Sequence, residues 1–222
     1  MIDLYGMGSP NVVKIFLALE EMGLPYKAIP VDVFSGAQFD PEFIKLNPSA
    51  KVPVIVDHEG PGGRPYTVFE SGAILLYLAD KTGRFLPSDP RARFDAIQWM
   101  MVQMTGVGPM FGQFVHFMRF APPGNDYALS RYRTQVRRVL DVLEQRLNDM
   151  PYLGGSEYGV ADMATFPWAR NTGPLLGKQV EADYPKLMAW VADIAARPAV
   201  VKALTAVDAL REKTTAFNKA KP

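Results

Sequence analysis

A proline directly before a β-branched run is the feature that most constrains how this chain can fold. The pair Val52-Pro53 precedes Val54–Val56, whose residues favour a strand. Because proline has no N–H to donate to a neighbouring strand, Pro53 must stand at the start, the edge or a bend of a sheet. A loop rich in Gly and Pro follows, and a second short strand is expected over Tyr66–Phe69.

The residues after this second strand predict a buried helix. Glu70-Ser71 is followed by Ala, Ile, Leu and Tyr residues that are typical of such a helix. Ser71 has the residue type and the position of an N-cap. A helix N-terminus at this point would attract a carboxylate.

The chain before the proline alternates between strand and helix patterns. We expect a strand over Ile2–Tyr5, a helix from Asn11 to a C-cap at Gly23, a strand over 26–33 and a short helix over 41–46. Together with the later strands and helix, the order β-α-β-α-β-β-α is thioredoxin-like. Its first two strands should be parallel, and its last two should form a hairpin.

Helical patterns dominate the rest of the chain. The segment 83–90, with its Gly, two Pro and Asp, reads as a linker. The expected helices span 91–120, with breaks near Gly106 and Pro109, then 127–149, 160–176 and 184–197, and the polar residues 212–222 are expected to be frayed or disordered. We therefore predict an α/β thioredoxin-like N-terminal domain, residues 1–82, followed by an all-α helical C-terminal domain, residues 91–222.

Composition excludes several classes of function. The 222 residues carry 24 Lys+Arg against 23 Asp+Glu, so no strong field favours nucleic acid or an anionic membrane. The chain has no cysteine and only 2 histidines, which excludes a protein thiol nucleophile and argues against a metal site. Any thiol chemistry must therefore use a thiol supplied by a ligand. The first residues lack a signal-peptide pattern and no apolar run approaches the ~18 residues of a membrane helix, so a cytoplasmic protein is expected.

Ser9 and Asn11 stand at the expected junction of the first strand and the first helix. Unpaired N–H groups and positive partial charge collect at such a junction, and they would lower the pKa of a bound thiol from about 8.5. The hydroxyl and the amide could each donate a hydrogen bond to the thiolate. The alternative is that both residues only shape the turn and cap the helix. The residue types alone favour this alternative. The motifs farther along the chain, around Val52-Pro53 and Glu70-Ser71, favour the thiol-binding role instead.

These motifs resemble the soluble glutathione transferases, and most of all the bacterial nu-class disulfide reductases. The resemblance rests on Y-x-x-x-S-P-N-x-x-K-I, V-D-V-F-S-G-A-Q-F-D-P-E-F, N-P-S-A-K-V-P-V-I-V-D-H and E-S-G-A-I-L-x-Y-L-A. In the helical part, W-M-M-V-Q-M-T-G-V-G-P-M-F-G-Q and H-F-x-x-F-A-P match as well. The resemblance therefore covers nearly the whole chain.

The resemblance implies a glutathione site. Ser9 and Asn11 would contact the glutathione sulfur, and Gln38 would make a further contact. A cis Val52-Pro53 bond would present the backbone of Val52 to the cysteinyl part. The γ-glutamyl carboxylate would bind the pair Glu70 and Ser71.

Four other residues have weaker assignments. Lys51 could neutralise the glycyl carboxylate of glutathione, or it could be a solvated loop lysine. In the resembling class an Arg at the position of Arg131 contacts a second glutathione, and the alternative is an ordinary surface arginine. His116 is expected to be packed or hydrogen-bonded rather than a general base, and Tyr5, inside a strand pattern, is expected to be structural.

The activity implied by the resemblance is glutathione-dependent disulfide reduction without a protein cysteine. The co-substrate would be glutathione, with two molecules or one glutathione disulfide per subunit, and the second substrate a small disulfide or an electrophile. The resemblance also implies a homodimer. The balanced charge predicts no nucleic acid or membrane as a partner. Two alternatives stay open, namely general conjugation of electrophiles to glutathione and a non-catalytic binding or regulatory protein of the same fold.

Overall fold

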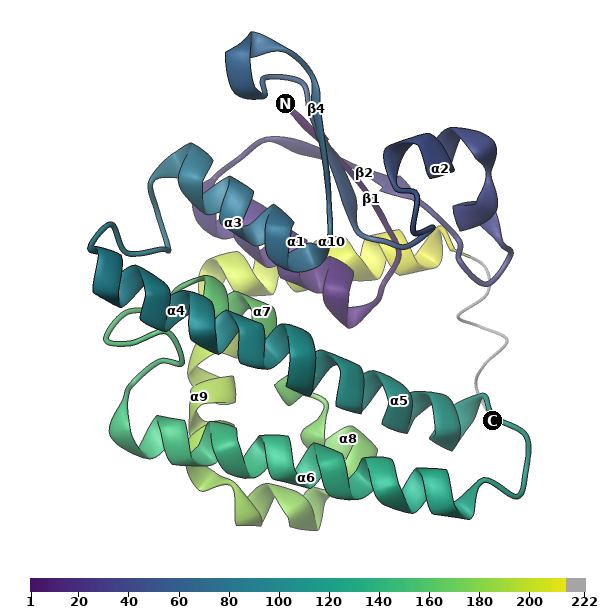
Figure 1. Cartoon of the computed structure of the whole chain (residues 1–222), viewed down its shortest axis with the longest axis vertical. Helices are drawn as coiled ribbons and strands as arrows, with labels where there is room; N and C mark the ends of the chain where they lie inside the picture. The colour runs from purple at the N-terminus through teal and green to yellow at the C-terminus, as the bar shows by residue number, and fades with distance from the viewer. Residues whose placement is uncertain (215–222) are drawn as a thin grey trace. The chain divides into compact units, whose positions relative to one another are not determined.

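The computed structural model of the chain describes residues 1–214 (Figure 1). Its residues form two compact units. One unit combines residues 1–84 with the segment that starts at Arg197, and the other spans Phe85–Ala196.

The first unit is built on a four-stranded sheet with the strand order β2-β1-β3-β4. Its strands are β1 (Ile2–Gly6), β2 (Tyr26–Pro30), β3 (Val54–Asp57) and β4 (Tyr66–Phe69). Strand β1 runs parallel to β2 and antiparallel to β3, and β3 and β4 form an antiparallel hairpin. This arrangement confirms the thioredoxin-like pattern. Strand β2 ends at Pro30, before the predicted end at residue 33, because the Asp32 carboxylate accepts the N–H of Phe34 and turns the chain.

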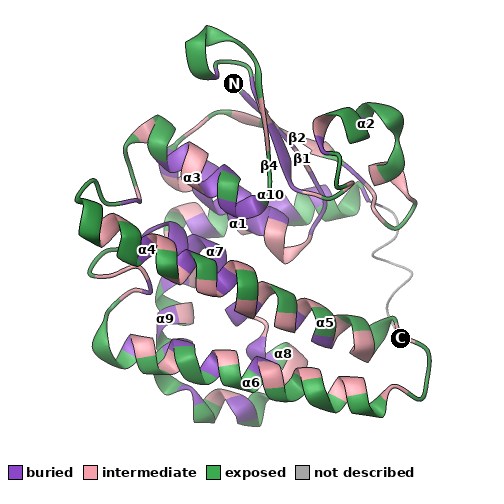
Figure 2. Ribbon diagram, viewed as in Figure 1, coloured by how far each residue is buried: buried purple, intermediate pink, exposed green. Residues whose placement is uncertain are grey.

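In the described part of this unit, four helices and two 3-10 turns accompany the sheet: α1 (Pro10–Met22), η1 (Ala37–Phe39), α2 (Pro41–Leu46), η2 (Pro61–Gly63), α3 (Ser71–Thr82) and α10 (Pro198–Glu212). Helix α1 packs against both α3 and α10 and is buried along most of its length (Figure 2). It ends at the predicted C-cap, Gly23, whose φ of 68° lies in the left-handed region.

Helix α10 is an element that the sequence analysis did not identify. Its buried residues recur at spacings of three and four, at Val200, Ala203, Val207 and Leu210. The helix groups with the sheet unit, whereas the sequence assigned all residues after 90 to the helical domain. The division at residues 83–90 stays a prediction. Most of the tail expected to be disordered, residues 215–222, lies outside the described residues.

The regular elements described in the second unit are helices and helical turns. They are α4 (Pro90–Val102), η3 (Gln103–Val107), α5 (Gly108–Arg119), α6 (Asp126–Asp149), α7 (Val160–Ala169), α8 (Thr172–Leu176), η4 (Lys178–Asp183) and α9 (Pro185–Ala195). Helix α6 packs against α5 and α9. Its buried side chains share one face and are Val136, Leu140, Leu143 and Leu147.

Two predictions for this unit can be compared with the structure. The break expected near Gly106 is a π-helical turn between α4 and α5. The single helix expected over 160–176 is wrong, because the chain forms α7 and α8 instead. Asn171 donates its side-chain N–H to the carbonyl of Pro167 at 2.7 Å and so closes α7. Throughout the part of the chain that is described, each helix is too short or too polar to pass through a bilayer.

Candidate functional site

The register of the sheet brings three of the sequence motifs to one end of the first unit. Tyr5, near the end of β1, lies opposite Val54 at the start of β3. Val54 in turn lies opposite Phe69 at the end of β4. The turn after β1, the proline before β3 and the start of the helix after β4 therefore lie at the same end of the sheet.

The first motif is the turn between β1 and α1. Ser9 is the residue before the helix, with φ −103° and ψ 154°, and its carbonyl accepts the N–H groups of Val12 and Val13 at 3.0 Å. Its side chain makes no capping hydrogen bond to α1. Asn11 follows within the first turn of the helix and is half-buried. Both residues thus lie at the positive end of the α1 dipole.

The second motif is the proline-bent segment. The Val52-Pro53 bond is cis, as the resemblance implies, and Pro53 is buried. Asn47 fixes the loop before it, since its amide donates to the Lys51 carbonyl at 2.8 Å and its side-chain oxygen accepts from Ser49. The Lys51 side chain is exposed. The sequence analysis did not assign this role to Asn47, although a buried Asn before Pro-Ser is a common turn signal.

The third motif is the start of α3, where one prediction is wrong. Ser71 is not the N-cap; it is the first residue of the helix, and Glu70 occupies the cap position. Glu70 has φ 68° and ψ 118°, a backbone conformation that costs a residue with a side chain about 1–3 kcal/mol. This conformation exposes the Glu70 side chain, while Ser71 is buried. The Ser71 hydroxyl accepts a hydrogen bond from the Lys14 ammonium at 3.2 Å.

Lys14 is a residue of this site that the sequence analysis missed. Its side chain comes from α1 and is 1% exposed. Burial lowers the pKa of Lys14 to about 7, and the nearby Glu70 carboxylate opposes part of that shift. A signal was present, because position 14 follows Asn11 by three residues and so shares its helix face.

Of the remaining predicted residues, one lies in the sheet unit and two lie in the helical unit. Gln38 lies in η1, and its side-chain oxygen is buried with no hydrogen-bond partner among the described residues. A buried acceptor of this kind is satisfied by a donor from a ligand or water. Arg131, on α6, belongs to the second unit and is exposed. His116 is exposed too, and its ring meets Phe117 edge to face at 5.2 Å between ring centroids.

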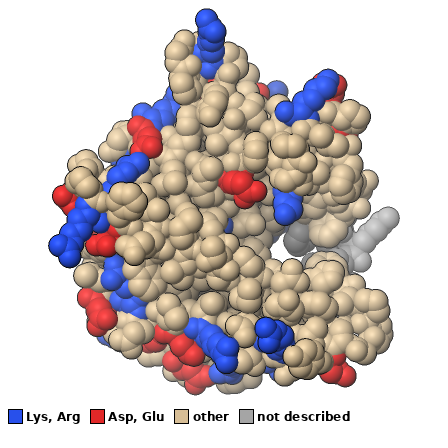
Figure 3. All heavy atoms as spheres, in the orientation of Figure 1, with Lys and Arg blue, Asp and Glu red and all other residues tan. Residues whose placement is uncertain are grey.

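The surface shown in Figure 3 carries mixed charges, and the described residues form no cluster suited to a metal ion. In the view of Figure 3, positive and negative side chains are interspersed, and neither sign covers a continuous area. Among residues 1–214, no three His, Asp or Glu side chains are grouped so that they could hold a metal ion. The site therefore offers hydrogen-bond donors, a helix N-terminus and one buried ammonium.

Two family models match most of the chain. The model of the glutathione S-transferase N-terminal domain matches residues 8–81, and that of the C-terminal domain matches residues 99–198. The chain belongs to the glutathione S-transferase family. The candidate residues from Ser9 to Ser71 lie within the N-terminal model, and Arg131 lies within the C-terminal model.

Relatives of this glutathione transferase include proteins whose bound ligands are known. The disulfide-bond oxidoreductase YfcG of Escherichia coli is 46% identical over 92% of this chain and 94% of its own length. A glutathione transferase of Burkholderia graminis, with two glutathione molecules bound per subunit, is 46% identical with a TM-score of 0.84, over 91% of this chain and 87% of that one. A glutathione transferase of Pseudomonas putida, with one glutathione disulfide bound per subunit, is 40% identical with a TM-score of 0.87, over 91% and 90% of the two chains.

Proposed function

We propose that this transferase is a glutathione-dependent disulfide reductase whose nucleophile is the thiolate of bound glutathione. One observation carries the proposal. The sheet register gathers a helix N-terminus, a cis-proline edge and the Glu70-Ser71 pair at one end of the sheet, in a chain that has no cysteine. The name of the Escherichia coli relative, a disulfide-bond oxidoreductase, supports the same reaction.

Glutathione would lie along the proline-bent segment. The Val52 backbone would pair with its cysteinyl unit as an added strand, and Pro53 would hold that backbone in place. The γ-glutamyl end would bind Glu70 and Ser71, so that its amino group faces the Glu70 carboxylate and its carboxylate faces the N-terminus of α3.

Three further contacts complete the binding proposal. Gln38 would satisfy its buried acceptor oxygen with a donor of the tripeptide. Lys51 would pair with the glycyl carboxylate. Ser9 and Asn11 would donate hydrogen bonds to the sulfur, and the α1 dipole would favour the thiolate over the thiol.

The reaction then needs two thiol–disulfide exchanges. The bound thiolate attacks one sulfur of the substrate disulfide, the S–S bond breaks, and the other half leaves as a thiolate that takes up a proton. A second glutathione thiolate attacks the glutathione sulfur of the mixed disulfide and releases the remaining thiolate. Two glutathiones are oxidised to one glutathione disulfide, one substrate disulfide is reduced to two thiols, and the two thiol protons of glutathione end on the products.

The second glutathione and the assembly belong to the same proposal. The neighbours from Burkholderia graminis and Pseudomonas putida support two glutathiones, or one glutathione disulfide, per subunit. Arg131 would contact the second molecule. We further propose that the enzyme is a cytoplasmic homodimer, as its resemblance to the soluble bacterial glutathione transferases implies.

The test compares reduction of a small symmetrical disulfide, such as cystamine, with conjugation of an aryl halide, both with glutathione. Disulfide reduction should exceed the uncatalysed rate and be the faster of the two reactions. Asn11→Ala should lower kcat/KM for the disulfide about 10- to 100-fold, because one charge-assisted hydrogen bond to the thiolate is lost. Asn148→Ala, at an exposed position on α6, is the matched control and should leave the rate unchanged.

Each alternative gives a different result in this test. Faster conjugation than disulfide reduction would identify a general glutathione transferase. Calorimetry without any heat of glutathione binding would favour the non-catalytic alternative. Disulfide reduction at the background rate would reject the proposal.

A further inference from the structure

The carbonyl of Gly8, one residue before Ser9, is held by an arginine from the last described helix. The Nε and Nη2 groups of Arg211 each donate to the Gly8 oxygen at 3.3 Å. The third nitrogen, Nη1, donates to the Asp208 carboxylate at 2.9 Å, which orients the guanidinium from its own helix. The Arg211 side chain thus connects α10 to the turn between β1 and α1.

Position 8 is shaped to receive this arginine. A Cβ atom at Gly8 would overlap the Arg211 side chain, so glycine is required there for space. Gly8 is buried. The Arg211 side chain can therefore approach the backbone at position 8 closely only because that residue is glycine.

The held peptide group is the one that leads into Ser9. The Gly8 oxygen and the Ser9 N–H belong to the same plane, and that N–H donates to the Met7 carbonyl at 2.7 Å. On its other side, the Ser9 carbonyl is fixed by the first N–H groups of α1. Arg211 thus fixes the peptide plane from which the Ser9 side chain projects, and it places a guanidinium near the positive end of the α1 dipole.

Two ion pairs join the last turn of α1 to the beginning of α10, at the opposite end of both helices from Arg211. Arg197 pairs with Glu21 at 2.6 Å, and Lys202 pairs with Glu20 at 2.7 Å. These ion pairs involve the last turns of α1, far in sequence from Ser9. They can attach α10 without the help of Arg211.

We propose that Arg211 is a positioning residue for the glutathione thiolate, acting through the Gly8 carbonyl on the turn that presents Ser9. The inference rests on the proposed function, because it concerns the thiol bound at that turn. It assigns to the C-terminal helix a part in setting the reactivity of the sulfur.

The test uses Arg211→Met and Arg211→Lys in the full chain, with Arg197→Met as the matched control. The bound thiol is titrated by the ultraviolet absorbance of the thiolate, and steady-state kinetics are measured with cystamine. Arg211→Met should raise the pKa of the bound thiol by about 0.5–1 unit. It should also lower kcat about 10-fold, with little change in the KM for glutathione, because the turn is displaced while the rest of the tripeptide site stays intact.

The two other variants separate positioning from general stability. Arg211→Lys, which keeps the charge and one donor, should leave the pKa of the bound thiol close to the wild-type value. Arg197→Met should lower the melting temperature and leave the thiol pKa and kcat at the wild-type values. If Arg211→Met matches the wild type in both readouts, or if Arg197→Met shifts them equally, the inference is wrong.

A double-mutant cycle with Gly8→Ala gives a second measurement. Gly8→Ala should reproduce the kinetic defect, because its Cβ displaces the arginine. In an Arg211→Ala background the same change should have little further effect, since the space is then empty. If the decreases in kcat caused by the two substitutions multiply in the double variant, Gly8 and Arg211 act separately and the inference is wrong. Wild-type protein that binds no glutathione, or binds it with an ordinary thiol pKa, would instead overturn the proposed function.

Discussion

Glu70 stores backbone strain at the point where the tripeptide would bind. Its φ of 68° lies in a region that residues with a side chain rarely occupy. The neighbouring elements impose this conformation, because β4 ends at Phe69 and α3 begins at Ser71, so Glu70 alone must make the turn between them. Strain that persists in this way supports the proposal that Glu70 serves ligand binding.

Replacing Glu70 separates stability from binding. Glycine tolerates positive φ, so Glu70→Gly should raise the free energy of unfolding by about 1 kcal/mol, the relieved strain less the added chain entropy of glycine. The same change should raise the KM for glutathione, because the γ-glutamyl amino group loses its carboxylate. Urea denaturation and steady-state kinetics measure the two effects. Glu70→Gln keeps the strain and should weaken binding without the gain in stability; a Glu70→Gly protein less stable than wild type would contradict this reasoning.

Lys14 should give the protein a pH-dependent stability. Its pKa falls from 10.5 to about 7 on folding, mainly through burial, so the unfolded chain binds more protons between these values. Stability should therefore rise with pH above about 7, with a slope of at most ~1.4 kcal/mol per pH unit. Lys14→Met should remove that slope in urea denaturation at pH values from about 7 to 9.5. Lys202→Met, which replaces an exposed lysine, should keep it, and equal slopes in wild type and Lys14→Met would contradict the assignment.

Local patterns predicted some site residues and missed others for a physical reason. Ser9 and Asn11 stand in a short turn-and-helix pattern that depends on nearby residues, whereas the cis form of the Val52-Pro53 bond was expected from the family resemblance. The partner of Ser71 depends instead on how α3 packs on α1, and no local pattern shows this packing. For the same reason the sequence could suggest the face of Lys14 but not its burial.

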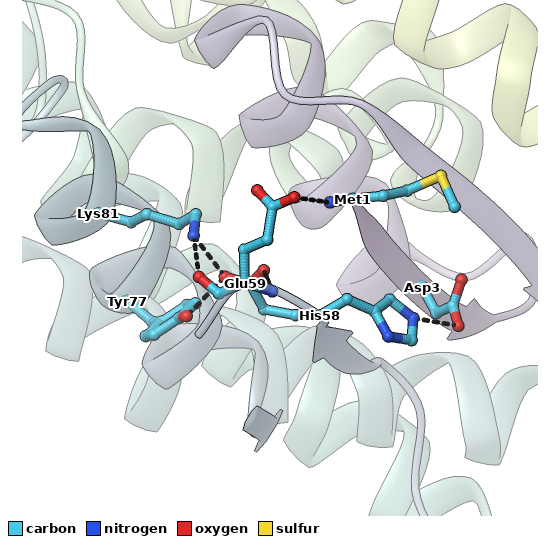
Figure 4. Close-up of polar contacts among 7 residues, drawn as sticks. Met1, Asp3, His58, Glu59, Tyr77 and Lys81 are labelled. Atoms are coloured by element: carbon cyan, nitrogen blue, oxygen red, sulfur yellow. Dashed lines mark hydrogen bonds and ion pairs between the residues drawn. The ribbon is translucent and has the colours of Figure 1, made fainter. Parts of the chain in front are cut away.

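At the scale of elements, a buried carboxylate ties the end of β3 to α3. Asp57 accepts hydrogen bonds from the Tyr77 hydroxyl at 2.6 Å and from the Lys81 ammonium at 2.8 Å. Figure 4 shows the Tyr77 and Lys81 side chains pointing toward the same place. Burial alone would raise the pKa of Asp57, but Lys81, Tyr77 and the N–H of Glu59 together hold it below its usual value. Figure 4 also shows the pairs Met1–Glu59 and His58–Asp3 beside this contact.

Tyr77→Phe should loosen this link between strand and helix. The variant removes one donor from a fully buried carboxylate and should cost about 1–3 kcal/mol of unfolding free energy at neutral pH. The depressed pKa means that the Asp57 contribution is present above pH 3.8 and is lost as pH falls through the folded value. In Tyr77→Phe the pKa of Asp57 should be lowered less than in the wild type. The stability that Asp57 contributes should therefore be lost at a higher pH. Tyr66→Phe, the same change at the exposed tyrosine that contacts the Tyr77 ring, is the control for urea denaturation; equal losses in both variants would exclude the role of Asp57.

The elements themselves were predictable where one local signal dominates. The Gly23 cap and the alternating strands follow directly from residue type. Helix α10 was not predicted although its apolar spacing is regular, and its place in the sheet unit depends on packing against α1, which no local pattern shows. The split of 160–176 into two helices depends on the Asn171 contact with Pro167, which helical spacing does not reveal.

At the scale of the whole molecule, the last helix returns to the unit in which the chain begins. The residues proposed to bind glutathione in that unit are therefore flanked by segments from both ends of the described chain. A net charge of +1 gives the molecule little long-range attraction for an anionic tripeptide. Binding must then depend on local contacts, so single residues should decide how many glutathiones the chain holds.

Arg131 provides the test of that number. Calorimetric titration of the wild type should give two glutathiones, or one glutathione disulfide, per 24.6 kDa chain. Arg131→Ala should keep the first glutathione and lose the second, and it should weaken glutathione disulfide binding about 10- to 100-fold, because a charge-assisted hydrogen bond to a carboxylate is removed. Arg138→Ala, an exposed arginine on the same helix, should bind like the wild type. Two glutathiones in the Arg131→Ala protein would show that Arg131 is an ordinary surface residue, and a single glutathione in the wild type would mean that the resolving thiol attacks from solution.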